Sequence, residues 1–250
     1  MARAGRGRLD RQLIRGPRRE IEKTRRKPIH SFVDAIILTV GALLPIMNPF
    51  STAPLFVSLT ANFDPARRNS QALMACIYAF AIIVVFLLAG SAIVDFFGIS
   101  IPGIRSAGGL IIMAIGFRML FPTATAAGSA EAAAPPDTDI AFSPLAMPSL
   151  AGPGSIAVVM TAAAQIPSAH PGDWVLVFAG VIVGMAATLV FSYLVLRLAG
   201  TLVRFLGRQG IDAMTRIFGF LLICIGMQFL LTGIADFYGL GIGVAAAKPA

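Results

Sequence analysis

Residues 45–54 read PIMNPFSTAP and lie inside a long apolar segment, and residues 144–153 read PLAMPSLAGP in a second one. Both stretches have proline at positions 1, 5 and 10. Proline inside a helix removes a backbone hydrogen bond and kinks or breaks the helix. Within a membrane, such irregular backbone is tolerated only where protein or a water-filled cavity covers it. Two breaks at matching places in two halves of a chain therefore indicate a transporter-type site between two repeats.

The composition of the chain excludes a water-soluble globule. Of its 250 residues, 57% are hydrophobic and only 13% are charged, and the mean hydropathy is +0.82. This composition is typical of a protein that crosses a membrane several times. We therefore expect an all-α, polytopic membrane protein that contacts the lipid bilayer over its outer surface.

The net charge of +8 comes largely from the beginning of the chain, where residues 1–27 hold 11 of the 20 lysines and arginines. The remaining nine are scattered near the ends of the apolar segments. The body of the chain has no basic face with interleaved aromatic residues. The charge therefore indicates membrane topology, and we expect no nucleic-acid partner.

The apolar segments and the turn signals between them predict six membrane spans. These spans cover about residues 32–61, 72–97, 104–121, 140–166, 174–199 and 211–237. The expected organisation is a basic disordered tail at 1–28, a first three-helix repeat at 29–121, a flexible linker at 122–139, a second three-helix repeat at 140–238 and a C-terminal tail at 239–250.

A second internal similarity supports the division into two units. Residues 109–120 read GLIIMAIGFRML and residues 219–230 read GFLLICIGMQFL, with two glycines seven residues apart in each. Each unit has three spans, an odd number, so the second unit enters the membrane from the opposite side. The sequence thus predicts two inverted repeats with Pro-broken first helices. The glycines expected to permit close helix packing are Gly108, Gly109, Gly116, Gly219 and Gly226.

The distribution of arginine between the loops predicts the orientation. Loops one, three and five hold seven arginines, whereas loops two and four and the C-terminus hold only Arg105 and Lys248. The positive-inside rule therefore places both termini on the non-cytoplasmic side. The basic tail at 1–28 predicts the reverse, and we give more weight to the body of the chain because its five loops agree.

The broken helices supply the candidate binding groups. A half-helix that begins near Pro54 or Pro153 would present free N–H groups and a positive dipole end, which suit the carboxylate of a small zwitterion. The candidate substrate-binding residues are Asn48, Ser51, Thr52, Gly152, Gly154 and Ser155. The expected helix breaks are Pro45, Pro49, Pro54, Pro144, Pro148 and Pro153. In the alternative interpretation, the prolines only shape helix packing and hydroxyl groups bond the freed backbone.

Few charged side chains lie within the predicted spans. Asp34 and Asp95 could bind a coupling proton or sodium ion, although both lie near span ends, where solvated carboxylates are common. Arg105 and Arg118 also lie near span ends, and we expect these side chains to reach the membrane surface. The residues expected as interhelical hydrogen-bond partners are Gln71, Gln165 and Gln228.

Four stretches of the chain resemble a known family. Residues 48–56 (NPFSTAPLF), 97–105 (FGISIPGIR), 115–122 (IGFRMLFP) and 144–154 (PLAMPSLAGPG) closely resemble the MarC/UPF0056 family of bacterial inner-membrane proteins. The resemblance covers about residues 32–236, whereas the first 28 residues depart from the family's pattern. It implies six spans with outward-facing termini, a location in the bacterial inner membrane, and kinship with transporters of small neutral amino acids such as glycine and alanine.

Together these observations predict a secondary transporter, an exporter or an exchanger, of small neutral amino acids. The chain has no phosphate-binding P-loop, no Ser-His-Asp signature and no HExxH pattern, so we expect neither an enzyme nor a bound cofactor or metal. The alternatives are a drug or organic-solute exporter of the same fold and a membrane scaffold that transports nothing. The sequence makes no prediction about the oligomeric state.

Overall fold

A computed structural model of the chain describes residues 28–121, 135 and 138–240, and every regular element among them is helical. The elements are α2 (Pro28–Met47), α3 (Pro49–Leu59), α4 (Pro65–Phe97), α5 (Ile101–Leu120), η1 (Ala141–Leu150), α7 (Pro153–Ala169), α8 (Trp174–Arg197) and α9 (Ala199–Phe237). The predicted all-α class is confirmed. The tails predicted at 1–28 and 239–250 and the linker predicted at 122–139 lie almost entirely outside the described residues.

Side-chain caps and prolines define where the long helices begin. Asp64 accepts hydrogen bonds from two backbone N–H groups in the first turn of α4, which has Pro65 as its first residue. Ser100 caps α5 in the same way. Helix α4 ends at Gly98, whose φ of 62° is a left-handed conformation that glycine adopts at little cost. The predicted second and third spans are thus confirmed as α4 and α5.

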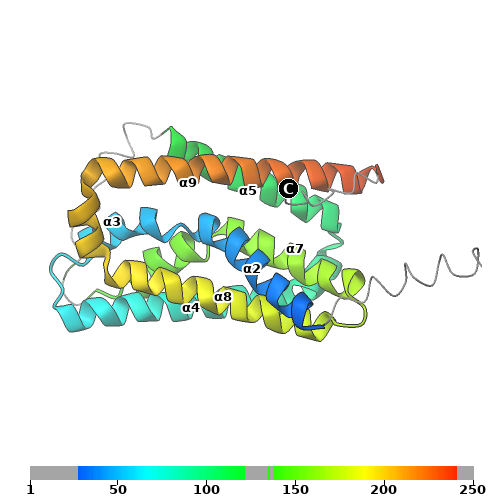
Figure 1. The fold of residues 1–250 in the computed structure, drawn as a ribbon, viewed down its shortest axis with the longest axis horizontal. Helices are drawn as coiled ribbons and strands as arrows, with labels where there is room; N and C mark the ends of the chain where they lie inside the picture. The colour runs from blue at the N-terminus through cyan, green and yellow to red at the C-terminus, as the bar shows by residue number, and fades with distance from the viewer. Residues whose placement is uncertain (1–27, 122–134, 136–137, 241–250) are drawn as a thin grey trace, which may run out of the picture.

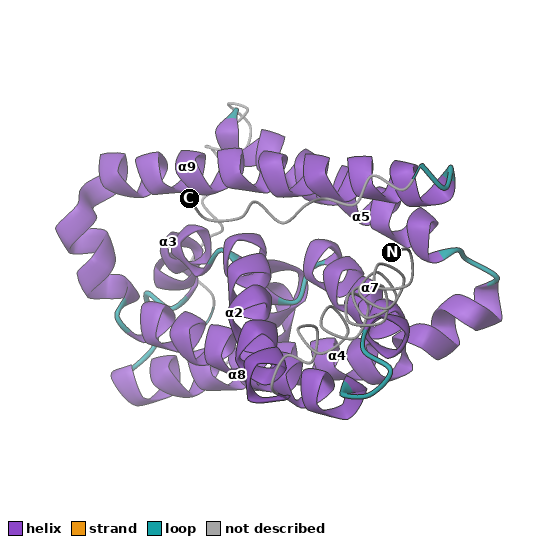
Figure 2. Cartoon of the chain, turned by 45° about the vertical axis from the view of Figure 1, so that its right-hand side comes forward, coloured by secondary structure: helices purple, strands orange, loops and turns teal. Residues whose placement is uncertain are grey.

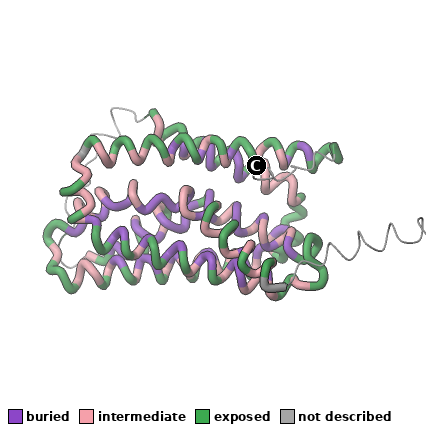
Figure 3. The backbone as a smooth tube through the Cα atoms, in the orientation of Figure 1, coloured by how far each residue is buried: buried purple, intermediate pink, exposed green. Residues whose placement is uncertain are grey.

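The helices form three layers (Figures 1 and 2). In Figure 1, α5 and α9 lie side by side in the upper layer, and α4 and α8 lie in the lower layer. The two broken segments, α2–α3 and η1–α7, lie between these layers. Figure 3 shows that buried residues concentrate in the middle layer and on the helix faces that cover it. The largest fully buried side chains include Phe56, Leu43, Leu145, Leu150, Ile83 and Ile112.

The outer surface carries large apolar side chains that water would not favour. Leu38 on α2, Leu88 on α4 and Phe220 on α9 are 71%, 65% and 58% exposed. Soluble monomers rarely expose extensive apolar patches, whereas a lipid bilayer covers such a surface at no cost. Within the described residues, five helices are long and apolar enough to cross a membrane, and six if η1 and α7, bent by 62°, form one broken span. The chain is therefore a multi-pass membrane protein.

Two predicted spans differ in detail from the observed helices. The first, predicted at 32–61, consists of α2, which is long enough to cross a membrane by itself, and the short apolar helix α3. The sixth, predicted at 211–237, is the apolar part of α9 at Gln209–Phe237. Gly207, with φ 65° and ψ 178°, separates this part from residues 199–206, so the basic connection before the last span is itself helical.

Helices α5 and α9 approach each other closely because glycines face each other at two places. A methyl group on Gly109 would lie 2.5 Å from the carbonyl oxygen of Gly226, and one on Gly116 would lie 2.7 Å from that of Gly219. From the first pair to the second, the residue number increases along α5 and decreases along α9, so the two helices run antiparallel. The predicted role of these glycines in close helix packing is confirmed.

Replacing Gly226 by alanine is expected to destabilise the protein by about 1–3 kcal/mol, the usual cost of overpacking. The new methyl group would lie 2.6 Å from the carbonyl oxygen of Gly109 and 2.7 Å from the backbone nitrogen of Met113, neither of which can yield without moving a helix. The melting temperature of the purified protein in detergent measures this effect.

The matched control is Gly41→Ala, at an exposed position of α2 with no neighbouring atom within 4 Å of the added methyl group. This control is expected to match or exceed the stability of the original protein, because alanine is favoured over glycine in helices by roughly 0.5–1 kcal/mol. Equal melting temperatures for the two variants would contradict the close packing of α5 and α9.

Candidate functional site

The first break lies at Asn48, between α2 and α3. Its backbone angles of φ 35° and ψ 70° are left-handed, a conformation that asparagine tolerates better than most residues. Its side-chain Oδ1 accepts a hydrogen bond from the backbone N–H of Ser51 at 3.3 Å, so Asn48 caps α3. Pro49 takes the first position of α3, where the missing N–H costs no helical hydrogen bond.

Two prolines of the first motif lie within helices rather than at the break. Pro45 lies in the last turns of α2, and Pro54 lies inside α3. The prediction that a half-helix begins near Pro54 is therefore wrong for the first unit, where it begins at Pro49. Helix α3 continues past Pro54, and its neighbours Ala53 and Phe56 are fully buried.

The second break has a different form. Element η1 contains Pro144 and Pro148, and each is preceded by an extended residue, Ser143 or Met147, with φ near −125° and ψ near 125°. The residue before a proline is pushed toward this extended region by the proline ring. The next helix, α7, begins at Pro153 with Gly152 as its cap, which confirms the predicted half-helix start in the second unit.

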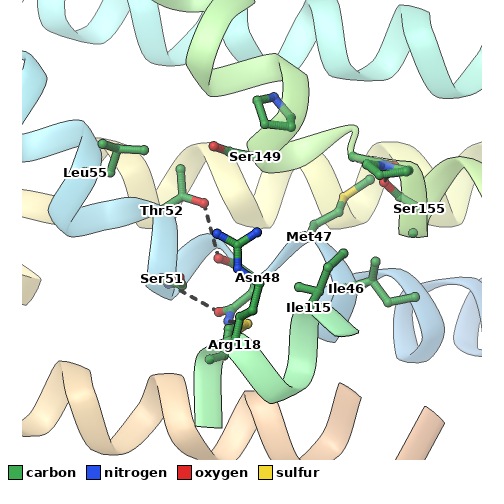
Figure 4. Close-up of a pocket in the computed structure, with 15 residues that line it drawn as sticks. Ile46, Met47, Asn48, Ser51, Thr52, Leu55, Ile115, Arg118, Ser149 and Ser155 are labelled. Carbon is green, nitrogen blue, oxygen red and sulfur yellow. Dashed lines mark hydrogen bonds between the residues drawn. The ribbon is translucent and has the colours of Figure 1, made fainter. Parts of the chain in front are cut away.

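The two breaks line one cavity of about 480 Å³ (Figure 4). This volume lies within the range of about 300–1,000 Å³ that is usual for small-molecule sites. All six predicted substrate-binding residues line it, together with neighbours from α2, α3 and α5. The lining residues are Ile46, Met47, Asn48, Ser51, Thr52, Leu55, Ile115, Arg118, Met119, Pro148, Ser149, Gly152, Pro153, Gly154 and Ser155.

Several polar side chains of the cavity bond the irregular backbone around them. The Thr52 hydroxyl donates to the carbonyl of Asn48 at 3.4 Å. The hydroxyl of Ser155, which is 1% exposed, donates to the carbonyl of Gly152 at 2.9 Å. In this respect the alternative interpretation of the hydroxyl groups is confirmed. The oxygen of each of these hydroxyl groups can still accept a hydrogen bond. The Ser51 hydroxyl has no hydrogen-bond partner among the described residues.

Helix ends of opposite polarity meet at the cavity. The last carbonyl groups of α2, at Ile46 and Met47, have no donor in their own helix, and they carry the negative end of its dipole. The first N–H groups of α7, at Gly154 and Ser155, carry the positive end of theirs. The cavity can therefore offer acceptors to an ammonium group and donors to a carboxylate.

Arg118 is a cavity residue that the analysis of the sequence missed. It lies in the last turn of α5, and we expected its side chain to reach the membrane surface. The residue is exposed, and Figure 4 shows that its side chain also extends from α5 along the cavity, toward Asn48 and Thr52. The overlay of residues 109–120 on 219–230 places Arg118 opposite Gln228, so a polar residue occurs in both copies. The occurrence of a polar residue at this position in both stretches could have singled out Arg118 in the sequence.

The acidic coupling candidates lie away from the cavity lining. Asp34 is half-buried near the start of α2, and Asp95 is exposed in the last turn of α4. Their role in coupling stays a prediction.

Arg105 forms a polar cluster near the other end of α5. It pairs with Asp236 of α9 at 2.6 Å and donates a hydrogen bond to Gln165 of α7. These partners connect three helices, and because Asp236 is 44% exposed, the expectation that Arg105 extends to the membrane surface stays a prediction. The role of Gln165 as an interhelical partner is confirmed.

The fold and the cavity define a multi-pass membrane protein with two broken helices at its centre. Residues 33–238 match the family described as MarC family integral membrane protein, and the chain belongs to this family. Similar relatives are the UPF0056 inner membrane protein MarC of Escherichia coli (strain K12), Shigella flexneri and Shigella boydii serotype 4 (strain Sb227). Each is 46% identical over 211 residues, which cover 81% of this chain and 95% of the relative.

These relatives confirm the resemblance found in the sequence and the expected location in the bacterial inner membrane. No solved structure matches the chain.

The left-handed conformation of Asn48 allows a test of the first break. Asn48→Ala is expected to lower the free energy of unfolding by about 2 kcal/mol, because it loses a helix cap and strains a left-handed position. Asn48→Gly is expected to cost less than half as much, since glycine adopts the conformation freely and is itself an acceptable cap. Thermal unfolding in detergent compares the two variants. If alanine were tolerated as well as glycine, the left-handed turn would be refuted.

Proposed function

We propose that the protein is a secondary transporter that moves small neutral amino acids across the bacterial inner membrane through the cavity between its broken helices. The observation that supports this proposal is the convergence of both proline-rich breaks, 99 residues apart in the sequence, on one cavity of about 480 Å³. Broken helices beside a central cavity are typical of secondary transporters, in which helix ends bind the substrate. The proposed activity is export or exchange.

The proposal includes two inverted three-helix repeats. Under such a repeat α2, α3, α4 and α5 correspond to η1, α7, α8 and α9. The contacts between helices support this correspondence, because most contacts have a counterpart. The contact of α2 with α8 has its counterpart in the contact of η1 with α4. The contact of α3 with α8 corresponds to that of α7 with α4. The contact of α3 with α9 corresponds to that of α7 with α5.

The interface between the third helices has the same symmetry. Gly109 and Gly116 of α5 correspond to Gly219 and Gly226 of α9. If each glycine is replaced by its counterpart in the other repeat, the contact of Gly109 with Gly226 turns into the contact of Gly219 with Gly116. Both contacts occur in the structure. Equivalent helices that pack antiparallel in this way support opposite orientations of the two units in the membrane.

The chemistry of the cavity supports a small zwitterion as the substrate. Carbonyl groups at the end of α2 suit an ammonium group, and N–H groups at the start of α7 suit a carboxylate. The lining combines these groups with small residues such as Gly152 and Gly154, which allow a ligand to approach the backbone. A larger drug or organic solute and a scaffold without transport are the alternative outcomes of the experiment below.

The transport experiment uses the purified protein in proteoliposomes loaded with radiolabelled glycine or alanine. The original protein is expected to release the label faster than empty liposomes. Ser51→Met is expected to reduce this flux at least tenfold, because it fills the cavity with a larger side chain while keeping the backbone hydrogen bond to Asn48. The matched control, Ser91→Met, lies on an exposed face of α4 and is expected to retain the flux.

The absence of amino-acid flux with correctly folded protein would contradict the proposal. Flux of drugs instead of amino acids would favour the exporter of organic solutes, and no flux of either would favour the scaffold.

We further propose that both termini lie on the non-cytoplasmic side, as the arginines of loops one, three and five indicate. A cysteine at Gly172, in the turn before α8, is then expected to react with a membrane-impermeant maleimide in cells with a permeabilised outer membrane. A cysteine at the exposed Asn62, in the turn before α4, is expected to react only after the inner membrane is opened. Cys224 would be replaced beforehand. The opposite labelling pattern would reverse the orientation.

A further inference from the structure

We propose that Arg118 is the residue that binds the carboxylate of the transported molecule, so that the cavity accepts only small molecules with a free carboxylate. This inference rests on the proposed function, because it assumes that the cavity is the substrate site. The inference assigns the recognition of the substrate carboxylate to one residue, Arg118. A substrate without a negative group would then lack this contact.

The position of Arg118 supports this role. Figure 4 shows the side chain extending from α5 along the cavity, and Arg118 lines this cavity with residues of both breaks although it is itself exposed. Arg118 makes no hydrogen bond or ion pair with any described residue, and the cavity lining contains no aspartate or glutamate. Arg105, in contrast, is paired with Asp236 at the other end of the same helix.

The chemistry of arginine makes an anionic ligand the natural partner. A guanidinium group remains charged under all relevant conditions and offers five N–H donors but no acceptor. Its planar fork matches the two oxygens of a carboxylate, which it binds through parallel hydrogen bonds. An arginine that faces a cavity and has no counter-ion among the described residues is a candidate substrate contact.

A second feature of the cavity has the same electrostatic sign. The start of α7, at Gly152 to Ser155, lines the cavity with the positive end of a helix dipole. Arg118 and this helix end therefore favour one negative group, whereas the described lining offers an ammonium only neutral acceptors, namely carbonyl and hydroxyl oxygens. A substrate with one carboxylate and one ammonium fits this arrangement. An acidic amino acid would bring a second carboxylate for which the lining holds no second cation, and a basic one would bring a second cation close to Arg118.

The experiment measures binding of three related molecules to the full chain in detergent by isothermal titration calorimetry. L-Alanine has a carboxylate and an ammonium, propionate has only the carboxylate, and L-alaninamide has only the ammonium. The original protein is expected to bind alanine most tightly, propionate more weakly and alaninamide at least tenfold more weakly than alanine. Arg118→Gln is expected to lower the affinity for alanine at least tenfold and to abolish the preference for alanine over alaninamide.

Two further variants separate recognition from folding and from general charge. Arg118→Lys keeps the charge without the planar fork, and it is expected to lose less affinity than Arg118→Gln. Arg197→Gln removes an exposed arginine at the end of α8, outside the cavity, and it is expected to retain the affinity of the original protein. Because Arg118 has no partner among the described residues, its substitution is expected to leave the melting temperature without ligand unchanged.

The possible results distinguish this inference from the proposed function. Unchanged alanine binding by Arg118→Gln, or equal binding of alanine and alaninamide, would overturn the role of Arg118 and leave amino-acid transport intact. Binding of propionate but not alanine, lost in Arg118→Gln, would support the carboxylate site and contradict amino-acid transport. No binding of any of the three molecules by folded protein would overturn both.

A lipid phosphate is the other oxyanion that could reach Arg118. The titration is therefore repeated in nanodiscs made with zwitterionic lipid alone and with added phosphatidylglycerol. A loss of alanine affinity in Arg118→Gln that is the same in both membranes supports substrate recognition. A loss that occurs only with phosphatidylglycerol would overturn the inference, because it would assign Arg118 to a lipid headgroup.

Discussion

The structure depends on the requirement that backbone polar groups be satisfied inside a membrane. Lipid offers no hydrogen bonds, so a helix can be interrupted only where protein or water meets its free N–H and carbonyl groups. The interruptions at Asn48 and in η1 lie in the middle layer, covered by α5 and α9 on one side and by α4 and α8 on the other. The layered packing and the central cavity are both consequences of this requirement.

Much of this arrangement could be predicted from the sequence, and the exceptions have physical reasons. The long helices could be predicted because their signals act through local backbone chemistry. These signals are the apolar runs, Asp64-Pro65 at a helix start and Gly98 at a helix end. The spacing of prolines did not reveal which one starts a helix, because α3 begins at Pro49 and continues past Pro54. The direction of the Arg118 side chain depends on how α5 packs against the breaks, which no local pattern encodes.

The two units differ where the cavity lies. Asn48 corresponds to the apolar Met147, whereas Arg118 and its counterpart Gln228 are both polar but only Arg118 lines the cavity. Ser149 lines the cavity, whereas its counterpart Phe50 stacks on Phe218, with ring centroids 5.4 Å apart, and also meets Phe191. Matching positions of the two proline motifs thus have different roles, since Ser149 lines the cavity and Phe50 makes an apolar contact.

The polar cluster around Arg105 also bears on the proposed transport. Arg105 lies 13 residues before Arg118 on α5, which is about 20 Å along the helix, so the cluster and the cavity occupy opposite ends. At that end, the ion pair of Arg105 with Asp236 connects α5 to α9, and the hydrogen bond of Arg105 to Gln165 connects α5 to α7. In the proposed transport, a substrate that leaves by this end requires the pair of Arg105 and Asp236 to separate first. The strength of this one contact, which lies far from the cavity, would then contribute to the activation barrier of each turnover.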